Sequence, residues 1–165
     1  MRPPARRANS QGIGASGVQA PLAAFALPVR VYYQDTDAGG VVFHGCYLSF
    51  FERARTEWLR ELGFQVRELA EHHGVLFIVR ELCVSYLRPA ELDDLLSVTA
   101  SLEHLGRAQF TLDQRVLRGA ELLVQGKINL ACVSMPGLKP ARVPPRVYVA
   151  LGKSAGRETN HEEQV

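Results

Sequence analysis

Two side chains able to do acid–base chemistry flank a glycine-rich turn near the start of the sequence. Asp37 stands just before an Ala-Gly-Gly stretch, and His44 follows it, shortly ahead of a long segment with helical periodicity. A carboxylate beside a helix N-terminus suits acyl chemistry, because the aligned amide dipoles stabilise negative charge developing on a carbonyl oxygen. We therefore take Asp37 and His44 as candidate catalytic residues that could face one substrate.

The same two residues also have a structural interpretation. Asp is common in turns, where its side chain accepts hydrogen bonds from backbone amides, and a His ahead of a helix can cap it. Two polar groups sharing one turn before a long helix favour a site, but the spacing alone leaves both interpretations open.

Two other motifs fail on their own requirements. A calcium loop opening at Asp35 would need an oxygen ligand at its fifth position and Glu at its twelfth, which hold Gly39 and Cys46. Residues 12–17 match G-x-G-x-x-G, but the strand and helix that dinucleotide binding requires are replaced by an Arg/Pro-rich stretch and a following proline. We expect no metal and no cofactor.

Composition favours some classes of protein and argues against others. The chain has 165 residues, 47% hydrophobic and 22% charged, which suits one soluble globular domain. No apolar run is long enough for an integral membrane segment. The net charge of +2 comes from arginines near the N-terminus, and the nearly neutral remainder argues against nucleic acid as a partner. Three widely spaced cysteines favour reduced thiols in a cytoplasmic protein.

Hydrophobic periodicity predicts the elements that position the candidate site. Residues 29–34 read as a strand, residues 47–62 as a long amphipathic helix ended by Gly63, and residues 65–72 as a weaker helix. Alternating apolar residues then predict four strands in antiparallel succession, with Gly106 and Gly119 at hairpin joints. These strands lie within 76–86, 96–103, 108–113 and 124–132. The expected fold is α+β, an antiparallel sheet wrapped around one long central helix.

The two ends of the chain are predicted to lie outside this domain. Residues 1–27 are rich in Arg, Pro, Ala, Gly and Ser and form an N-terminal extension that we expect to be disordered. The domain then spans 28–151. The proline-rich stretch from Met135 reads as an extended cover strand or loop, followed by a polar tail over 152–165.

The segment from Tyr33 through Asp37, His44 and Tyr47, followed by Phe-Glu-Arg-Ala-Arg-Thr-Glu at 51–57, resembles the signature of hotdog-fold acyl-CoA thioesterases. The resemblance extends to residues 88–96 and 135–144, covers about 28–149, and is to the 4-hydroxybenzoyl-CoA thioesterase family, YbgC type, associated with the Tol-Pal system. In that family the second Asp of Asp-x-Asp is the catalytic carboxylate, which corresponds to Asp37. The family's His corresponds to His44.

The resemblance implies hydrolysis of an acyl-CoA or acyl-carrier-protein thioester without a cofactor, by a homodimer or homotetramer with sites near subunit interfaces. Asp37 would attack the carbonyl or activate water, while the helix-start amides of Gly45 and Cys46 hold the carbonyl oxygen. We expect Cys46 to serve as a small residue at the start of the helix and its thiol not to act as a nucleophile. A hotdog hydratase or dehydratase, and a non-catalytic acyl-binding or carrier-binding module, are the alternative functions.

Overall fold

The computed structural model describes residues 25–155 of the chain. The G-x-G-x-x-G segment, most of the predicted N-terminal extension and the last ten residues lie outside that range. Within it the order is β1 (Phe25–Arg30), a 3₁₀ turn (Tyr33–Asp35), α1 (Cys46–Glu61), α2 (Val66–His73), β2 (Val75–Tyr86), β3 (Leu95–Leu105), β4 (Gln109–Arg118), β5 (Glu121–Ser134) and α3 (Pro145–Ser154). None of the helices in this part of the chain is long and apolar enough to cross a membrane.

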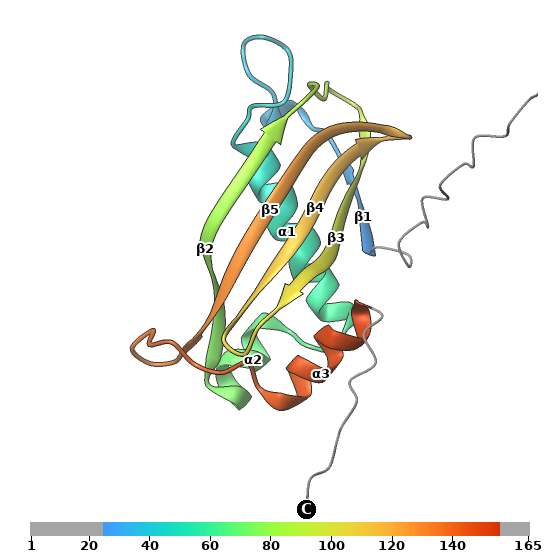
Figure 1. The fold of residues 1–165 in the computed structure, drawn as a ribbon. Helices are drawn as coiled ribbons and strands as arrows, with labels where there is room; N and C mark the ends of the chain where they lie inside the picture. The colour runs from blue at the N-terminus through green and yellow to red at the C-terminus, as the bar shows by residue number, and fades with distance from the viewer. Residues whose placement is uncertain (1–24, 156–165) are drawn as a thin grey trace, which may run out of the picture.

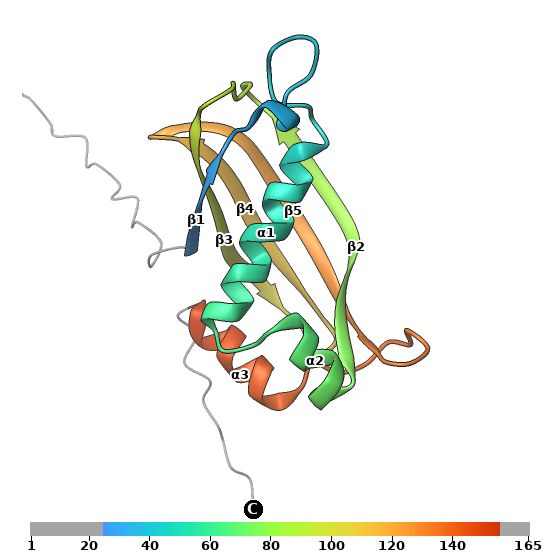
Figure 2. The same ribbon diagram turned by 180° about the vertical axis from the view of Figure 1, so that it is seen from behind.

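The strands form one antiparallel sheet that curls around α1, as the sequence predicts (Figure 1). Its order is β1-β3-β4-β5-β2. Seen from behind, α1 runs along the concave face, with the loop that precedes it at one end of the sheet and α2 and α3 at the other (Figure 2). The loop that contains Asp37 and His44 is therefore separated from the two shorter helices by the length of α1.

The central helix is held by its apolar stripe. The stripe residues Tyr47, Phe50, Phe51, Ala54 and Trp58 are all buried. Burying a side chain of Phe size stabilises a fold by about 1.5–3 kcal/mol, so this face fixes α1 firmly on the sheet.

The sheet accommodates α1 at one point of close approach. A Cβ atom at Gly126 would lie 2.8 Å from the Phe51 ring, so the missing side chain makes room for that ring. The cross-strand partner of Gly126 is Gln114, a fully buried residue of β4. Its Nε2 donates a hydrogen bond to the Phe51 carbonyl at 3.0 Å. The amide of Gln114 thus links the sheet to the middle of α1.

The strand succession differs from the sequence prediction at one step. The hairpins at Gly106 and Gly119 are confirmed, because β3 pairs with β4 and β4 with β5. However, β2 pairs with β5 and not with β3, so it lies at the edge of the sheet. The residues between β2 and β3 must therefore cross the end of the sheet, where they meet the loop before α1.

Element boundaries differ from the predictions at both ends of the domain. The first strand begins at Phe25, inside the predicted extension, and ends at Arg30, after which the chain turns through the 3₁₀ turn instead of continuing to residue 34. Residues 145–154, predicted to be extended or part of the polar tail, form α3. Proline is tolerated at the first helical position because no amide hydrogen is needed there, and Val147 and Leu151 bury one face.

Candidate active site

The candidate site is built on a tight hairpin that leads from the 3₁₀ turn into α1. Thr36 pairs with Val42, and the Asp37 amide donates to the Val41 carbonyl at 2.9 Å. The Gly40 amide closes the turn by donating to the Asp37 carbonyl at 3.0 Å. Gly40 has a φ of +78°, a left-handed conformation that glycine adopts without strain. Asp37 therefore occupies the first position of the turn.

The Asp37 carboxylate is exposed but oriented. Its Oδ1 accepts a hydrogen bond from the Gly39 amide at 2.7 Å. A Cβ atom on Gly39 would lie only 3.0 Å from that oxygen, so glycine provides the space for this arrangement. Among the described residues, none donates a hydrogen bond to Oδ2. The turn role considered for Asp37 from the sequence is present, and it leaves one carboxylate oxygen available for chemistry.

Asp35 has a different environment. Its side chain is buried, and Oδ2 accepts the Tyr32 amide at 2.9 Å. Its carbonyl accepts the Phe43 amide at 2.9 Å, which ties the two arms together at the base of the hairpin. Asp35 is therefore a structural residue of the hairpin.

His44 lies between the hairpin and α1, with an exposed side chain. Its ring packs on Phe43, with centroids 4.2 Å apart, and meets the edge of Tyr86 at 6.4 Å. No hydrogen bond or ion pair joins His44 to Asp37 within the described part of the chain. The fold thus places the two predicted residues in one loop, Asp37 on the hairpin and His44 just after it, and both side chains are exposed.

The start of α1 retains a free amide. Gly45 is the N-cap residue, no side chain caps the helix, and its first turn has no acidic residue. The Cys46 amide already donates to the Phe43 carbonyl at 2.9 Å, whereas the Gly45 amide has no acceptor among the described residues. A Cβ at Gly45 would lie 2.8 Å from the Phe43 ring, which explains glycine here. Of the two predicted carbonyl-binding amides, the available one is that of Gly45.

The Cys46 thiol is poorly suited to act as a nucleophile. Burial raises its pKa, and the nearby Asp35 carboxylate raises it further, while Arg53 acts in the opposite direction with a smaller effect. A raised pKa leaves less thiolate at neutral pH, and the thiolate is the reactive form.

A second segment, residues 89–94, supports the hairpin, a role that the sequence alone does not predict. The Val42 amide donates to the Ala90 carbonyl at 2.8 Å, and Val41 pairs with Glu91. The Ala90 amide in turn donates to the Tyr47 hydroxyl oxygen at 2.9 Å, in a buried position. This segment therefore bonds both to the hairpin and to the first turn of α1.

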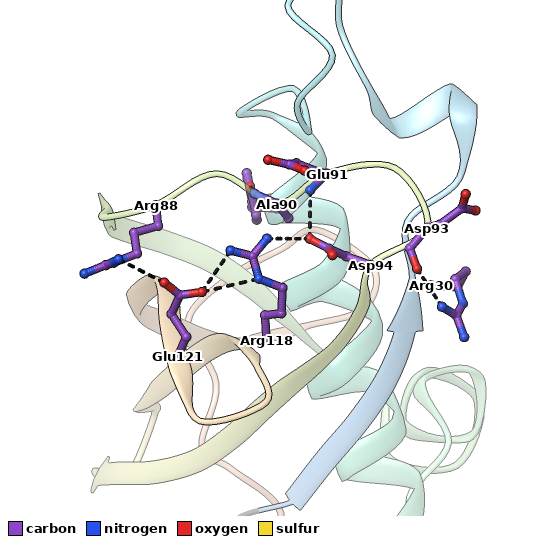
Figure 3. A network of polar contacts seen from close by, with 9 residues as sticks. Arg30, Arg88, Ala90, Glu91, Asp93, Asp94, Arg118 and Glu121 are labelled. Carbon is purple, nitrogen blue, oxygen red and sulfur yellow. Dashed lines mark hydrogen bonds and ion pairs between the residues drawn. The ribbon is translucent and has the colours of Figure 1, made fainter.

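Charged side chains hold that segment in place (Figure 3). Arg118 donates to Asp94 and Glu121, both at 2.8 Å, and Arg88 donates to Glu121 at 3.0 Å. Asp94 also accepts the Glu91 amide at 2.9 Å. Burial acts to raise the pKa of Asp94, but the hydrogen bonds from Glu91 and Arg118 outweigh it, so the pKa lies below its ordinary value. The network ties the β4–β5 hairpin to the segment that supports the site.

Comparison with known proteins identifies the family. The family model of the thioesterase superfamily matches residues 39–125, more than half of the chain. The chain belongs to the thioesterase superfamily. The match includes His44, Gly45 and Cys46 and begins just after Asp37.

Several thioesterases resemble the chain over most of its length. The acyl-CoA thioesterase YbgC of Haemophilus influenzae is 44% identical over 127 residues, which cover 77% of this chain and 93% of that protein. The acyl-CoA thioester hydrolase YbgC of Escherichia coli O6:H1 is 40% identical over 121 residues, 73% of this chain and 90% of that protein. The crystal structure of a probable thioesterase from Bartonella henselae matches with a TM-score of 0.71 and 40% identity, covering 74% of this chain and 100% of that chain. The predicted family, thioester-hydrolase class and hotdog fold are confirmed.

Proposed function

We propose that this thioesterase hydrolyses an acyl-CoA thioester to a free acid and coenzyme A. Support comes from the YbgC relatives and from one local arrangement, in which the Asp37 carboxylate stands on the hairpin that leads directly into the uncapped start of α1. An acyl thioester needs a nucleophile or base for its carbonyl carbon and a hydrogen-bond donor for its oxygen. Asp37 supplies the first and the Gly45 amide the second.

The proposed reaction has two possible first steps. Asp37 attacks the carbonyl carbon and expels the thiolate to give a mixed anhydride that water then hydrolyses, or it takes a proton from an attacking water. In both cases negative charge builds on the thioester oxygen beside the Gly45 amide and the positive end of the α1 dipole. His44, exposed next to that amide, orients the substrate or helps deliver a proton to the leaving thiolate.

Assaying thiol release from a panel of thioesters tests this function. The panel covers short aliphatic, aromatic and long-chain acyl groups on coenzyme A and on acyl carrier protein, each scored by kcat/KM. We expect stoichiometric release of acid and thiol from at least one coenzyme A thioester. Hydration of an enoyl thioester without thiol release would favour the hydratase alternative, and acyl-CoA that stays bound and intact over hours would favour a binding module.

The proposal includes a homo-oligomer formed through the edge strand β2. Ile78, Val79 and Leu82 are exposed apolar residues on this strand, and Val79 and Leu82 also line a cavity of about 530 Å³ against α1. An exposed apolar strand edge favours pairing with a second copy. We expect light scattering to give the molar mass of a dimer or tetramer. The variant Val79→Lys should have a lower molar mass, because the added charge weakens the association of the subunits. Glu81→Gln, at an exposed position on the same strand, makes the same +1 change in charge without removing an apolar side chain and serves as the control.

A further inference from the structure

Tyr86, the last residue of β2, bonds to the peptide group that carries the free amide. Its hydroxyl donates a hydrogen bond to the His44 carbonyl, with an Oη to oxygen distance of 3.2 Å. That carbonyl belongs to the same peptide unit as the Gly45 N–H. No described peptide bond other than Met135–Pro136 is cis, so the His44–Gly45 carbonyl and N–H point in opposite directions. A group that fixes the carbonyl therefore also fixes where the N–H is aimed.

The Tyr86 ring is itself held in place. It packs edge-on against Tyr47, with centroids 5.8 Å apart, and against His44 at 6.4 Å. Tyr47 is buried and bonded to the Ala90 amide, so the surface behind the Tyr86 ring is fixed. The backbone of Tyr86 pairs with Val124 of β5, and the amides that follow it donate to the Leu123 carbonyl. Tyr86 thus connects the sheet to the helix-start peptide group.

We propose that Tyr86 is a positioning residue, whose hydroxyl orients and polarises the His44–Gly45 peptide group so that the Gly45 amide binds the thioester oxygen as it becomes negative. This inference rests on the proposed function, because it takes the Gly45 amide as the donor to the substrate. Tyr86 acts through the peptide group and does not itself touch the reacting atoms.

The physical basis is hydrogen-bond cooperativity. A donor on a carbonyl oxygen withdraws electron density from the peptide group, which makes the N–H at its other side a stronger donor. A 3.2 Å contact is longer than the usual O–H···O distance of about 2.7–2.8 Å. As the thioester oxygen gains charge and draws on the Gly45 N–H, the His44 carbonyl becomes a better acceptor and this contact shortens. The Tyr86 hydroxyl therefore stabilises the transition state more than it stabilises bound substrate. Its loss should lower kcat more than it changes KM.

The variant Tyr86→Phe tests the inference, because it keeps the ring that packs on Tyr47 and His44 and removes only the hydroxyl. Given the net worth of one hydrogen bond, we expect kcat to fall by about 3- to 10-fold with KM unchanged. Tyr148→Phe removes a hydroxyl from α3, at the other end of the molecule, and should keep the wild-type kcat. The substrate is the acyl-CoA with the highest kcat/KM in the panel.

A spectroscopic measurement separates this inference from the proposed function. The same acyl-CoA, labelled with ¹³C at its carbonyl, is bound to Asp37→Asn, and its carbonyl stretch is recorded by difference infrared spectroscopy. A bond from the Gly45 amide lowers the stretching frequency, and we expect a smaller lowering when Tyr86→Phe is added. A lowering that is equal with and without the Tyr86 hydroxyl, or a wild-type kcat in Tyr86→Phe, would overturn the role of Tyr86 while leaving thioester hydrolysis intact. Failure of the wild-type protein to release thiol would instead overturn the proposed function.

Discussion

The Tyr47 hydroxyl oxygen accepts a hydrogen bond from the Ala90 amide at 2.9 Å in a buried position. This single bond joins the first turn of α1 to the segment that pairs with the Asp37 hairpin through Val42. The two elements that carry the proposed carboxylate and the proposed carbonyl-binding amide are therefore braced by a common neighbour. Because a buried amide without a partner is costly, this brace contributes to stability as well as to the geometry of the site.

Replacing Tyr47 by Phe tests that brace. The change keeps the buried ring but leaves the Ala90 amide without its acceptor, so we expect the free energy of unfolding to fall by about 1–3 kcal/mol. Urea denaturation followed by circular dichroism measures the change. Tyr33→Phe, at an exposed position, should leave the midpoint unchanged. An unchanged midpoint for Tyr47→Phe would mean that the Ala90 amide has another partner.

Gly39→Val tests whether the orientation of the Asp37 carboxylate matters. A Cβ at this position would lie 3.0 Å from Asp37 Oδ1, so the added side chain must displace the carboxylate. Displacement of a reacting group by about 1 Å can cost up to about 100-fold in rate, and we expect kcat to fall by about 10- to 100-fold. The turn residues 37–40 are exposed, so the melting temperature should change little. Ala38→Val enlarges a neighbouring exposed residue and should retain activity. An equal loss of kcat in both variants would contradict the role of the close approach between a side chain at residue 39 and Asp37 Oδ1.

Acid should weaken the network around Asp94. Its pKa lies below the ordinary value, so the folded state favours the ionised carboxylate more than the unfolded state does. The stabilisation is fully present above the unfolded pKa of about 3.9 and is lost as pH falls through the lower, folded value. We expect Asp94→Asn to lower the free energy of unfolding by about 1 kcal/mol at pH 7, because the pair is partly exposed. The difference from wild type should shrink as pH falls below the unfolded pKa of about 3.9; a constant difference from pH 7 to pH 2 would contradict the ionic contribution.

Much of this architecture could be predicted from local sequence patterns. The stripe from Tyr47 to Trp58 has the period of a helix and meets the sheet on that face, and the glycines at the two hairpins mark real turns. The position of β2 at the edge could not be predicted, because alternation shows which face of a strand is buried and not which strand lies beside it. The helix α3 could not be predicted from its proline-rich surroundings, because proline favours extended chain and yet also suits the first position of a helix, which Pro145 occupies here.

The candidate site also contains some residues that the sequence predicts and others that only the structure reveals. Asp37 and His44 stand out because two groups able to do acid–base chemistry flank one turn ahead of a long helix, and the family resemblance indicates the amides of Gly45 and Cys46. Ala90 gives no chemical signal in the sequence, since its role is carried by its backbone amide and carbonyl. The division of labour between Gly45 and Cys46 also depends on backbone geometry, because it follows from the bond between the Cys46 amide and the Phe43 carbonyl.

The most direct test of the central claim is the kcat of Asp37→Asn on the best acyl-CoA substrate. Asparagine keeps a side-chain oxygen that can accept the Gly39 amide, so the turn survives while the carboxylate is lost. Asp93→Asn serves as the control, because its left-handed backbone suits asparagine and its side chain is in no described hydrogen bond or ion pair. We predict a fall in kcat of about 10²- to 10⁴-fold for Asp37→Asn and wild-type activity for the control. Wild-type turnover by purified, folded Asp37→Asn would contradict the assignment of Asp37 as nucleophile or general base.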